Sequence, residues 1–509
     1  MPIKKLLIIF LFLTSCQSET PRHSSALNVN FQVGDVSSLS PHLLVDMRGR
    51  VLGKLLFEGL MRIDCQGRPQ LAGAERVEIS SDRTQYTFTL RKQFWSDGSQ
   101  VTSNQYVDSW RYALQPATNA PRADLFYLIK NGQKAKKGEI SIEQIGVSAP
   151  DPQTLVIQLE HSSAYFLHLL AQPLFAPLKA PTEEPTVFNG PFVIKKWEKG
   201  ISLQLEPNTL FWNRSSVHLP QINISCVTDP MTALYLYEKG QIDWIGDPIS
   251  PISNEATVQL REKGLALARP VDRFYWIYLN PSHPLLQSVK IRKALYLSIN
   301  REEITKHIFQ GAEPLLTPVH QSVIPYKPEQ EDLERARCLF KEGLEELNIH
   351  NTPSFTLSYA QYANVKPLAE YLKNSWEEAL GLTLQLQVNE WNVLRQNLEK
   401  GNFDVGGCFE SAFYGDPLEL LERFESLGNG NYCQWQNECF KQKLALIKKE
   451  SDEKKQIELL IEAESILADE TPFIPVFRAM HFYAHHPELK DYVFDATGCV
   501  DFAYARLNK

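Results

Sequence analysis

YTFTLRKQFWSDGSQVTSNQYVDSWRYAL, residues Tyr86–Leu114, holds three elements of structure in quick succession. The alternating residues of Thr84–Arg91, rich in Thr, Tyr and Phe, predict a β-strand. Asp97–Gly98 predicts a turn, because glycine adopts backbone angles that other residues avoid. Ser103–Leu114 predicts a helix that opens on a serine cap and carries its apolar residues at helical spacing. A strand, a turn and a helix in this order are typical of an α/β protein.

The same interleaving continues on both sides of this segment. Further strands are predicted at 26–33, 154–159 and 383–388, and further helices at 48–64, 163–171, 288–299 and 364–380. Residues 438–467 have the amphipathic pattern of one or two surface helices. No internal repeat is apparent, so the whole chain is expected to be one α/β protein.

Size and charge exclude several classes of protein. With 509 residues, 43% of them hydrophobic, the chain can bury a large core and is too long for one ordinary domain. The formal net charge is −8, and no basic stripe matches a phosphate backbone. Nucleic acid is therefore not an expected partner.

The N-terminus has the pattern of an export signal. MPIKK (1–5) is basic, LLIIFLFL (6–13) is an apolar run too short to span a bilayer, and LTSC (13–16) follows it. The ending resembles a bacterial lipobox, which implies cleavage after residue 15 and attachment of lipid to Cys16. An ordinary signal peptide with a chance cysteine is the alternative. Residues 16–25 then predict a lipidated polar tether on the periplasmic side of a membrane.

Seven further cysteines follow Cys16, an odd number that leaves at least one free thiol or an intermolecular bond. Cys433 and Cys439 could close a small loop. No Cys/His spacing predicts zinc, so neither metal nor cofactor is expected.

Motifs for catalysis are absent. The chain contains no GxxxxGK phosphate loop, no GxGxxG after a first strand, no HExxH and no GxSxG elbow. A hydrolase that uses two carboxylates brought together by the fold remains an alternative, since such pairs leave no local pattern. The prediction is that the protein is not an enzyme.

Tyr86–Leu114 resembles a signature of the peptide/nickel class of solute-binding proteins of ABC importers, the oligopeptide-binding lineage. In that signature a strand ends in Leu-Arg and is followed by W-S-D/N-G, then V-T and a helix with S-W. The resemblance continues in order along almost all of the chain after the signal. It covers SSLSPH (37–42), LLFEGL (55–60), NGPFVIKKW (189–197), LEPNTLFWN (205–213), YEKGQIDW (237–244), LNPSHPLLQSVKIRKALYLSINRE (279–302) and FIPVF (473–477).

The resemblance implies a two-lobed periplasmic-binding-protein-like fold of type II, large, with an extra subdomain and a hinge between the lobes. The chain is expected to divide into a signal peptide (1–15), a lipidated tether (16–25), lobe I (26–54 with 180–275 and 479–509), an extra subdomain packed on lobe I (55–179) and lobe II (276–478). The resemblance also implies a monomer that captures peptides between its lobes and delivers them to the permease subunits of an ABC transporter.

FDVGGCFESAFYGDP (403–417) aligns without gaps with the segment in which these proteins bind a peptide's amino end. At the position where the family has an aspartate, this chain has Phe413. The tyrosine that follows it in the family is present as Tyr414. Gly407 stands where the family usually has an arginine, and Glu410 stands where it has a tryptophan of the ligand pocket.

Other expected site positions are partly kept. Trp391 matches a second tryptophan of the family's ligand pocket. Near position 365, where the family has a histidine, this chain has Val365. Arg122 stands where relatives have an aromatic residue after a proline. Four more residues are expected to bind ligand: Met47, Arg48, Tyr275 and Trp276.

Two hypotheses for the ligand follow from these differences. In the first, Glu410 or Asp416 replaces the missing aspartate and pairs with a peptide's amine, since an unpaired buried charge is very unfavourable. In the second, the ligand has changed, Arg122 meets an anionic group and Phe413 stacks on an apolar one. The alternative ligands are a modified or cell-wall peptide, a metal chelate or a sugar. From another class, the alternatives are an exported hydrolase or a signalling adaptor.

Overall fold

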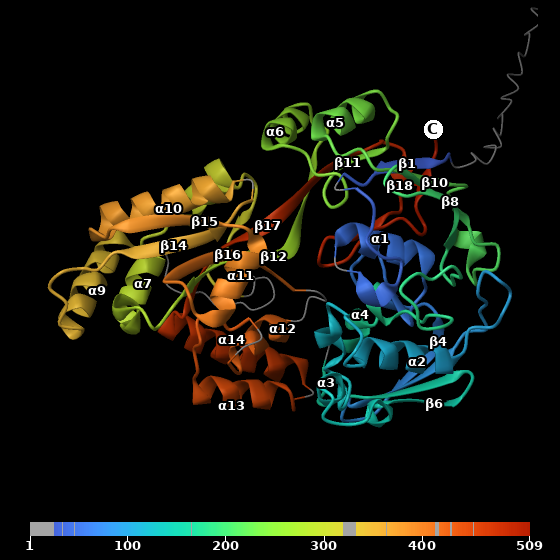
Figure 1. Ribbon diagram of the computed structural model, residues 1–509, viewed down its shortest axis with the longest axis horizontal. Coiled ribbons are helices and arrows are strands. Elements are labelled where there is room, and N and C mark those ends of the chain that lie inside the picture. Colours follow the sequence, from blue (N-terminus) through green and yellow to red (C-terminus); the bar gives the residue numbers. More distant parts are fainter. Residues whose placement is uncertain are drawn as a thin grey trace, which may run out of the picture.

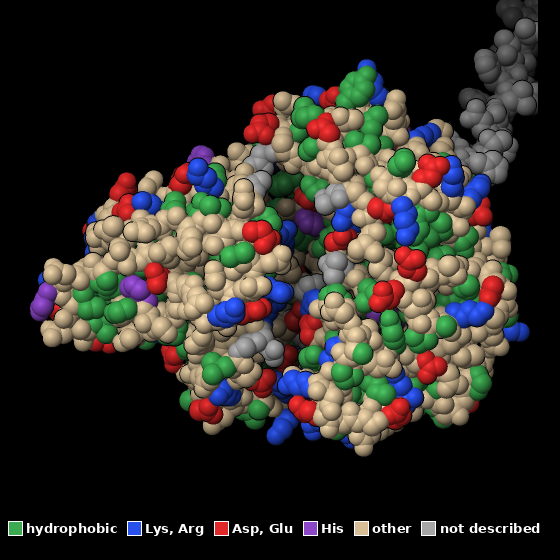
Figure 2. Space-filling model, in the orientation of Figure 1, with side chains coloured by type: hydrophobic (Ala, Val, Ile, Leu, Met, Phe, Trp, Pro, Cys, Tyr) green, Lys and Arg blue, Asp and Glu red, His purple; other side chains and the backbone are tan. Residues whose placement is uncertain are grey.

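The chain forms two lobes in a computed structural model (Figure 1). The structure describes residues 25–32, 34–44, 46–163, 165–318, 332–362, 364–412, 417–427, 430–450 and 452–509. The predicted signal peptide, Cys16 and almost all of the tether lie outside these residues. A hollow runs between the lobes, and basic, acidic and histidine side chains gather along it (Figure 2).

Lobe I is built on a four-stranded sheet in the order β1 (Leu27–Asn30), β10 (Ile222–Ser225), β9 (Ser202–Pro207) and β8 (Phe192–Glu198). β1 and β10 are parallel and the other pairs are antiparallel. The helix α1 (Met47–Leu56) contacts β8.

The extra subdomain carries a second four-stranded antiparallel sheet. Its order is β4 (Ala74–Ile79), β5 (Gln85–Leu90), β7 (Thr154–Gln158) and β6 (Val147–Asp151). The short elements around the two sheets are β2 (Met61–Ile63), β3 (Pro69–Leu71), α3 (Gly132–Lys136) and α4 (Phe166–Leu169). One hydrophobic cluster runs through this subdomain and lobe I, so the two share a core.

The segment Tyr86–Leu114 folds as predicted, into strand β5, a turn with Gly98 at φ 87°, and α2 (Ser103–Leu114). The cap differs by one residue. Thr102 precedes the helix and forms a capping box with Gln105, whose side chain accepts from the Thr102 N–H at 2.9 Å.

The helix predicted at 48–64 ends at Leu56. Beyond it, residues 189 and 190 replace the helical hydrogen bonds: Asn189 Nδ2 donates to the Glu58 carbonyl at 2.9 Å, and the Gly190 N–H donates to the Leu56 carbonyl at 2.9 Å. Phe57 is extended and packs against Phe188, with ring centroids 5.5 Å apart. Long-range partners therefore override the local helical pattern.

Lobe II is built on a mixed sheet in the order β11 (Trp244–Gly246), β17 (Phe473–His485), β12 (Leu267–Leu279), β16 (Val405–Ser411), β14 (Phe355–Ala360) and β15 (Leu384–Asn389), with β13 (Glu313–Pro314) beside β17. Hydrophobic clusters cover both of its faces. The longer helices of this lobe are α7 (Val289–Leu297), α9 (Leu333–Glu346), α10 (Val365–Leu380), α11 (Trp391–Lys400), α12 (Pro417–Leu421), α13 (Glu438–Ile447) and α14 (Glu453–Glu470).

β12 and β17 join the lobes. Each has 13 residues, and their pairing shifts register between Pro270 and Phe274. Close to this shift, Arg478 Nη2 lies 2.7 Å from Asp272 Oδ1. The hydrophobic clusters of lobe II extend from Phe274 to Phe477, so they include Phe274 and Tyr275 from the part of β12 assigned to lobe I. The division into lobes and subdomain stays a proposal.

Three smaller features complete the fold. Two helices of lobe I, α5 (Pro230–Glu238) and α6 (Asn254–Glu262), share a small cluster with β11. Cys433 is buried, Cys439 is exposed and both thiols are free, so the loop that they could close is not formed. Within the described ranges, no helix combines the length and apolar character needed to cross a bilayer.

Candidate functional site

A pocket of about 200 Å³ lies where the lobes meet at the hinge. Lobe I contributes residues next to β11 and on α6, the two crossing strands contribute their central residues, and lobe II contributes β16 and the start of α10. The lining of this pocket includes Asp247, Arg273, Phe309, Phe409, Phe477 and His481. A pocket lined from both lobes changes shape when the lobes move about the hinge.

Aromatic rings form one wall of this pocket, here called the hinge pocket. Phe477 lies with its ring centroid 4.3 Å from that of Phe309 and 6.0 Å from that of Phe409. The antiparallel register sets Phe409 opposite Tyr275, whose ring stacks on Phe477 at 5.5 Å. Successive strand residues point to opposite faces, so Phe409 and Arg273 share the pocket face while Glu410 points the other way.

Two charged side chains face the hinge pocket. The Arg273 guanidinium carbon lies 4.2 Å from the centroid of Phe409, and the side chain is exposed. Asp247 Oδ2 accepts from the Phe482 N–H at 3.1 Å. His481, which also lines the pocket, is buried, and this burial lowers the pKa of its imidazole, so it is neutral at pH 7.

Glu410 lies on the opposite face of the sheet, in the interior of lobe II, and is 8% exposed. Its carboxylate is ion-paired with Arg423 and accepts from Tyr278 Oη at 2.9 Å. The Cys408 thiol is 3.5 Å away. Its charge is thus already compensated inside the lobe, which does not favour a role in binding an amine from the cleft.

Tyr275 and Trp276 are buried in the hydrophobic clusters of lobe II, at 2% and 0% exposure. The ring of Tyr275 stacks on the ring of Phe477, which lines the hinge pocket. Trp276 packs on Phe473 on the far face, with centroids 4.7 Å apart. Trp391 is half-buried at the start of α11.

The remaining predicted residues of lobe I and the subdomain have partners of their own. Arg48 donates to Asp46 at 2.5 Å and to the Gly34 carbonyl at 2.8 Å, and Met47 precedes it at the start of α1. Arg122 forms two hydrogen bonds with Asp124, at 2.9 and 2.7 Å. These roles stay predictions, and Phe413, Tyr414 and Asp416 lie outside the described residues.

Sequence reasoning missed the residues that make the hinge pocket polar. Asp247 belongs to the proline-bearing stretch 247–251, and Arg273 directly precedes the aromatic run FYWIY (274–278). A charged residue next to prolines or next to an aromatic strand could have indicated a functional side chain beside a hinge.

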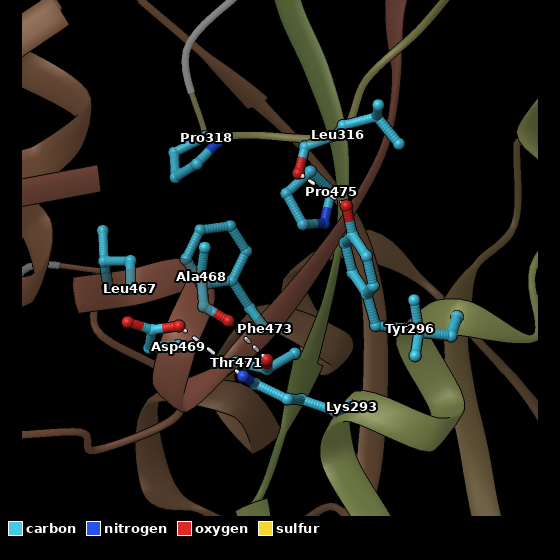
Figure 3. Close-up of a pocket in the computed structure, with 11 residues that line it drawn as sticks. Lys293, Tyr296, Leu316, Pro318, Leu467, Ala468, Asp469, Thr471, Phe473 and Pro475 are labelled. Atoms are coloured by element: carbon cyan, nitrogen blue, oxygen red, sulfur yellow. Dashed lines mark hydrogen bonds and ion pairs between the residues drawn. The ribbon is translucent and has the colours of Figure 1, made fainter. Parts of the chain in front are cut away.

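A smaller cavity of about 110 Å³ lies within lobe II, between α7, α14 and β17 (Figure 3). Its polar groups bind one another: Lys293 Nζ lies 3.6 Å from Asp469 Oδ1, Tyr296 Oη donates to the Leu316 carbonyl at 3.0 Å, and Thr471 Oγ1 donates to the Ala468 carbonyl at 2.9 Å. In the hinge pocket neither Arg273 nor Asp247 forms an ion pair with a described residue, so this pocket is the stronger candidate.

Metal ligands are not grouped in the structure. Across the described parts of the chain, no three His, Cys, Asp or Glu side chains come together in a way that could hold an ion.

Comparisons with known proteins agree with the fold. The chain is 29% identical over 504 residues to the oligopeptide-binding protein OppA of Bacillus subtilis, covering 94% of this chain and 92% of that protein. It is 26% identical over 502 residues to the periplasmic murein peptide-binding protein MppA of Escherichia coli, covering 92% and 90%. Among solved structures, Listeria monocytogenes OppA bound to peptide has 26% identity and a TM-score of 0.75, covering 96% and 99%.

The predicted fold class, a two-lobed binding protein with mixed α/β content, is confirmed by these neighbours. Residues 68–432, more than half of the chain, match the model of the bacterial extracellular solute-binding proteins, family 5. The chain belongs to this family of solute-binding proteins.

Proposed function

We propose that this solute-binding protein captures peptides between its lobes and delivers them to the permease of an ABC importer. The observation that carries the proposal is the hinge pocket, which takes its walls from both lobes and from both crossing strands. Closure of the lobes would surround a ligand held there and present the closed form to a membrane partner. Relatives described as oligopeptide-binding and dipeptide-binding proteins support a peptide as the ligand.

The composition of the hinge pocket suits a ligand whose side chains vary. Aromatic walls accept apolar groups without directional bonds, while Arg273 and Asp247 can hold charged groups that every free peptide carries. Binding without catalysis is part of the proposal, because the family is one of solute-binding proteins.

Native mass spectrometry of the protein purified from its own cells tests the ligand class. The expected result is a set of bound masses that fragment as peptides of mixed sequence. A single bound species that is a cell-wall peptide, a metal chelate or a sugar would replace the ligand in the proposal. Protein that neither carries peptides nor binds any from an added mixture would contradict peptide capture.

Lipid on Cys16 is proposed to hold the protein beside its permease, where tethering raises the effective concentration. Cys16→Ser is expected to move the protein from the membrane fraction to the soluble fraction of extracytoplasmic extracts. Cys65→Ser, which alters an exposed free thiol instead, is the matched control and is expected to stay with the membrane. An unchanged distribution of the Cys16 variant would contradict lipid anchoring.

A further inference from the structure

The lobes also meet away from the two crossing strands, where the extra subdomain contacts lobe II beside α13 (Figure 1). Ser162 follows β7 of the subdomain, and its Oγ donates to the Lys448 carbonyl, 286 residues further along the chain, at 2.8 Å. Close by, His161 Nε2 lies 3.8 Å from Glu422 Oε1 on the helical turn 422–424. These four residues are called the subdomain latch below.

The Ser162 hydroxyl completes the end of a helix in the other lobe. Carbonyls in the last turn of an α-helix have no partner within the helix. Lys448 is the C-cap of α13, so its carbonyl is such a group, and Ser162 supplies the donor. Ser162 is 7% exposed, so water reaches both groups only when the lobes separate. A hydrogen bond exchanged for water in this way changes an equilibrium by about two- to tenfold.

Lobe II holds its half of the subdomain latch in place. Lys448 Nζ lies 3.0 Å from Glu422 Oε1 and 2.8 Å from Glu425 Oε2. Burial alone would lower the pKa of Lys448, but the two carboxylates together raise it, so the ammonium group stays charged. These ion pairs fix the end of α13 against the turn 422–424, so little ordering is needed when Ser162 meets it.

The subdomain latch is also connected to the hinge pocket. Arg423, the residue after Glu422, is ion-paired with Glu410 and donates to the Ser411 carbonyl at 2.8 Å, both on β16. Phe409 of the same strand lines the hinge pocket. The turn that carries Glu422 is therefore attached to the strand that carries a wall of the pocket, and a contact at the latch holds that wall toward lobe I.

We infer that the subdomain latch holds the lobes together and sets how long a captured ligand stays enclosed. The inference deepens the proposed function, since enclosure matters for a protein that captures ligand between its lobes. Among the described residues, the extra subdomain contributes none to the lining of the hinge pocket, so it acts on closure and not on the ligand. No ligand atom takes part in the latch, so it favours the joined form equally for every ligand.

A distance measurement between two spin labels tests the inference. Cys65 of the subdomain and Cys338 of lobe II are exposed free thiols that can carry the labels. The other thiols open to labelling are first replaced by serine, at Cys16, Cys226 and Cys439. Pulsed electron resonance on the ligand-free protein then gives the joined fraction, which is the fraction of molecules with the label separation of this structure.

Two changes at Ser162 weaken the subdomain latch to different extents. Ser162→Ala removes the donor and is expected to lower the ratio of joined to separated molecules about two- to tenfold. Ser162→Asp is expected to lower this ratio by more than about tenfold, because its carboxylate meets the carbonyl end of α13 and the carboxylate of Glu422. The matched control is Ser465→Ala, which removes a hydroxyl that donates to the Glu462 carbonyl at 2.8 Å within lobe II alone. It is expected to keep the wild-type ratio.

Peptide kinetics give the second measurement. A mixture of short peptides is expected to raise the joined fraction of the wild type. Both Ser162 variants are expected to release these peptides faster, by the same factor by which the ratio of joined to separated molecules falls. Their association rate is expected to stay at the wild-type value, because the ligand enters the separated form before the latch is made.

The outcomes separate the latch from peptide capture. Unchanged label distances in both Ser162 variants, or an equal change in Ser465→Ala, overturn the inference and leave peptide capture standing. Variants whose lobes separate but which release peptides at the wild-type rate overturn the role in retention. Lobes that separate as expected in a protein that binds no added peptide contradict peptide capture and leave the subdomain latch standing.

Discussion

Asp495→Asn is expected to lower the free energy of unfolding by about 3–5 kcal/mol, because it removes a buried carboxylate that compensates two buried cations. Asp495 is 2% exposed. Its Oδ2 lies 2.9 Å from Lys54 Nζ and 3.2 Å from Arg50 Nη2, both on α1. Its Oδ1 accepts from the N–H groups of Thr497 and Cys499, each at 3.0 Å. One carboxylate thus joins the first helix of lobe I to the C-terminal segment.

Urea unfolding followed by tryptophan fluorescence measures this loss, with Asp491→Asn as the matched control. Asp491 pairs with Arg506 at 2.9 Å, but both side chains are more than half exposed. An exposed pair of this kind contributes about 0–1 kcal/mol. Equal effects of the two substitutions would contradict the assignment of Asp495 as a structural counter-ion.

The same contacts set the sign of the pH dependence. Burial alone would raise the pKa of Asp495, but Lys54 and Arg50, with the hydrogen bond from Thr497, together hold this pKa well below its usual range. In the unfolded chain the pKa is about 3.9. The stabilisation is therefore complete above about pH 4 and is lost as the pH falls below that value. The difference in free energy of unfolding between wild type and Asp495→Asn is therefore expected to become smaller as the pH falls below about 4.

Local patterns in the sequence predicted local structure well. The strand, turn and helix of Tyr86–Leu114 depend on neighbours in the chain, and only the capping residue shifted, from Ser103 to Thr102. The helix predicted at 48–64 was too long because residues 189 and 190 supply its missing backbone partners. Nothing within 48–64 records that distant segment.

The hinge pocket was harder to predict, because sheet pairing between distant segments assembles it. Asp247 and Arg273 meet only because β11 and β12 both pair with β17. The resemblance drew attention to 403–417, and Phe409 in that stretch does line the pocket. Alternation along a strand separates Phe409 from Glu410, but it does not say which of the two faces meets the cleft.

Glu410→Gln is expected to lower the free energy of unfolding by about 3–5 kcal/mol, because Arg423 then remains buried without a counter-ion. Arg423 also donates to the Ser411 carbonyl at 2.8 Å, so this pair fixes the end of β16 to the helical turn at 422–424. Urea unfolding measures the free energy of unfolding of this variant and of its matched control, Glu399→Gln. Glu399 forms an exposed pair with Arg395 on α11, for which about 0.5 kcal/mol or less is expected.

Replacement of both partners separates a structural role of Glu410 from a ligand-binding role. Arg423→Met alone leaves the buried Glu410 carboxylate unpaired, whereas Glu410→Gln combined with Arg423→Met removes both charges. Buried ion pairs replaced as a unit often lose little stability, so the double variant is expected to be more stable than either single variant. Peptide affinity of the folded double variant is expected to stay within about twofold of wild type, since a contact outside the hinge pocket contributes no charge-assisted bond to the ligand. A double variant that is stable but no longer binds peptides would return Glu410 to the role of amine partner, and would place the amino end of the ligand on the far face of β16.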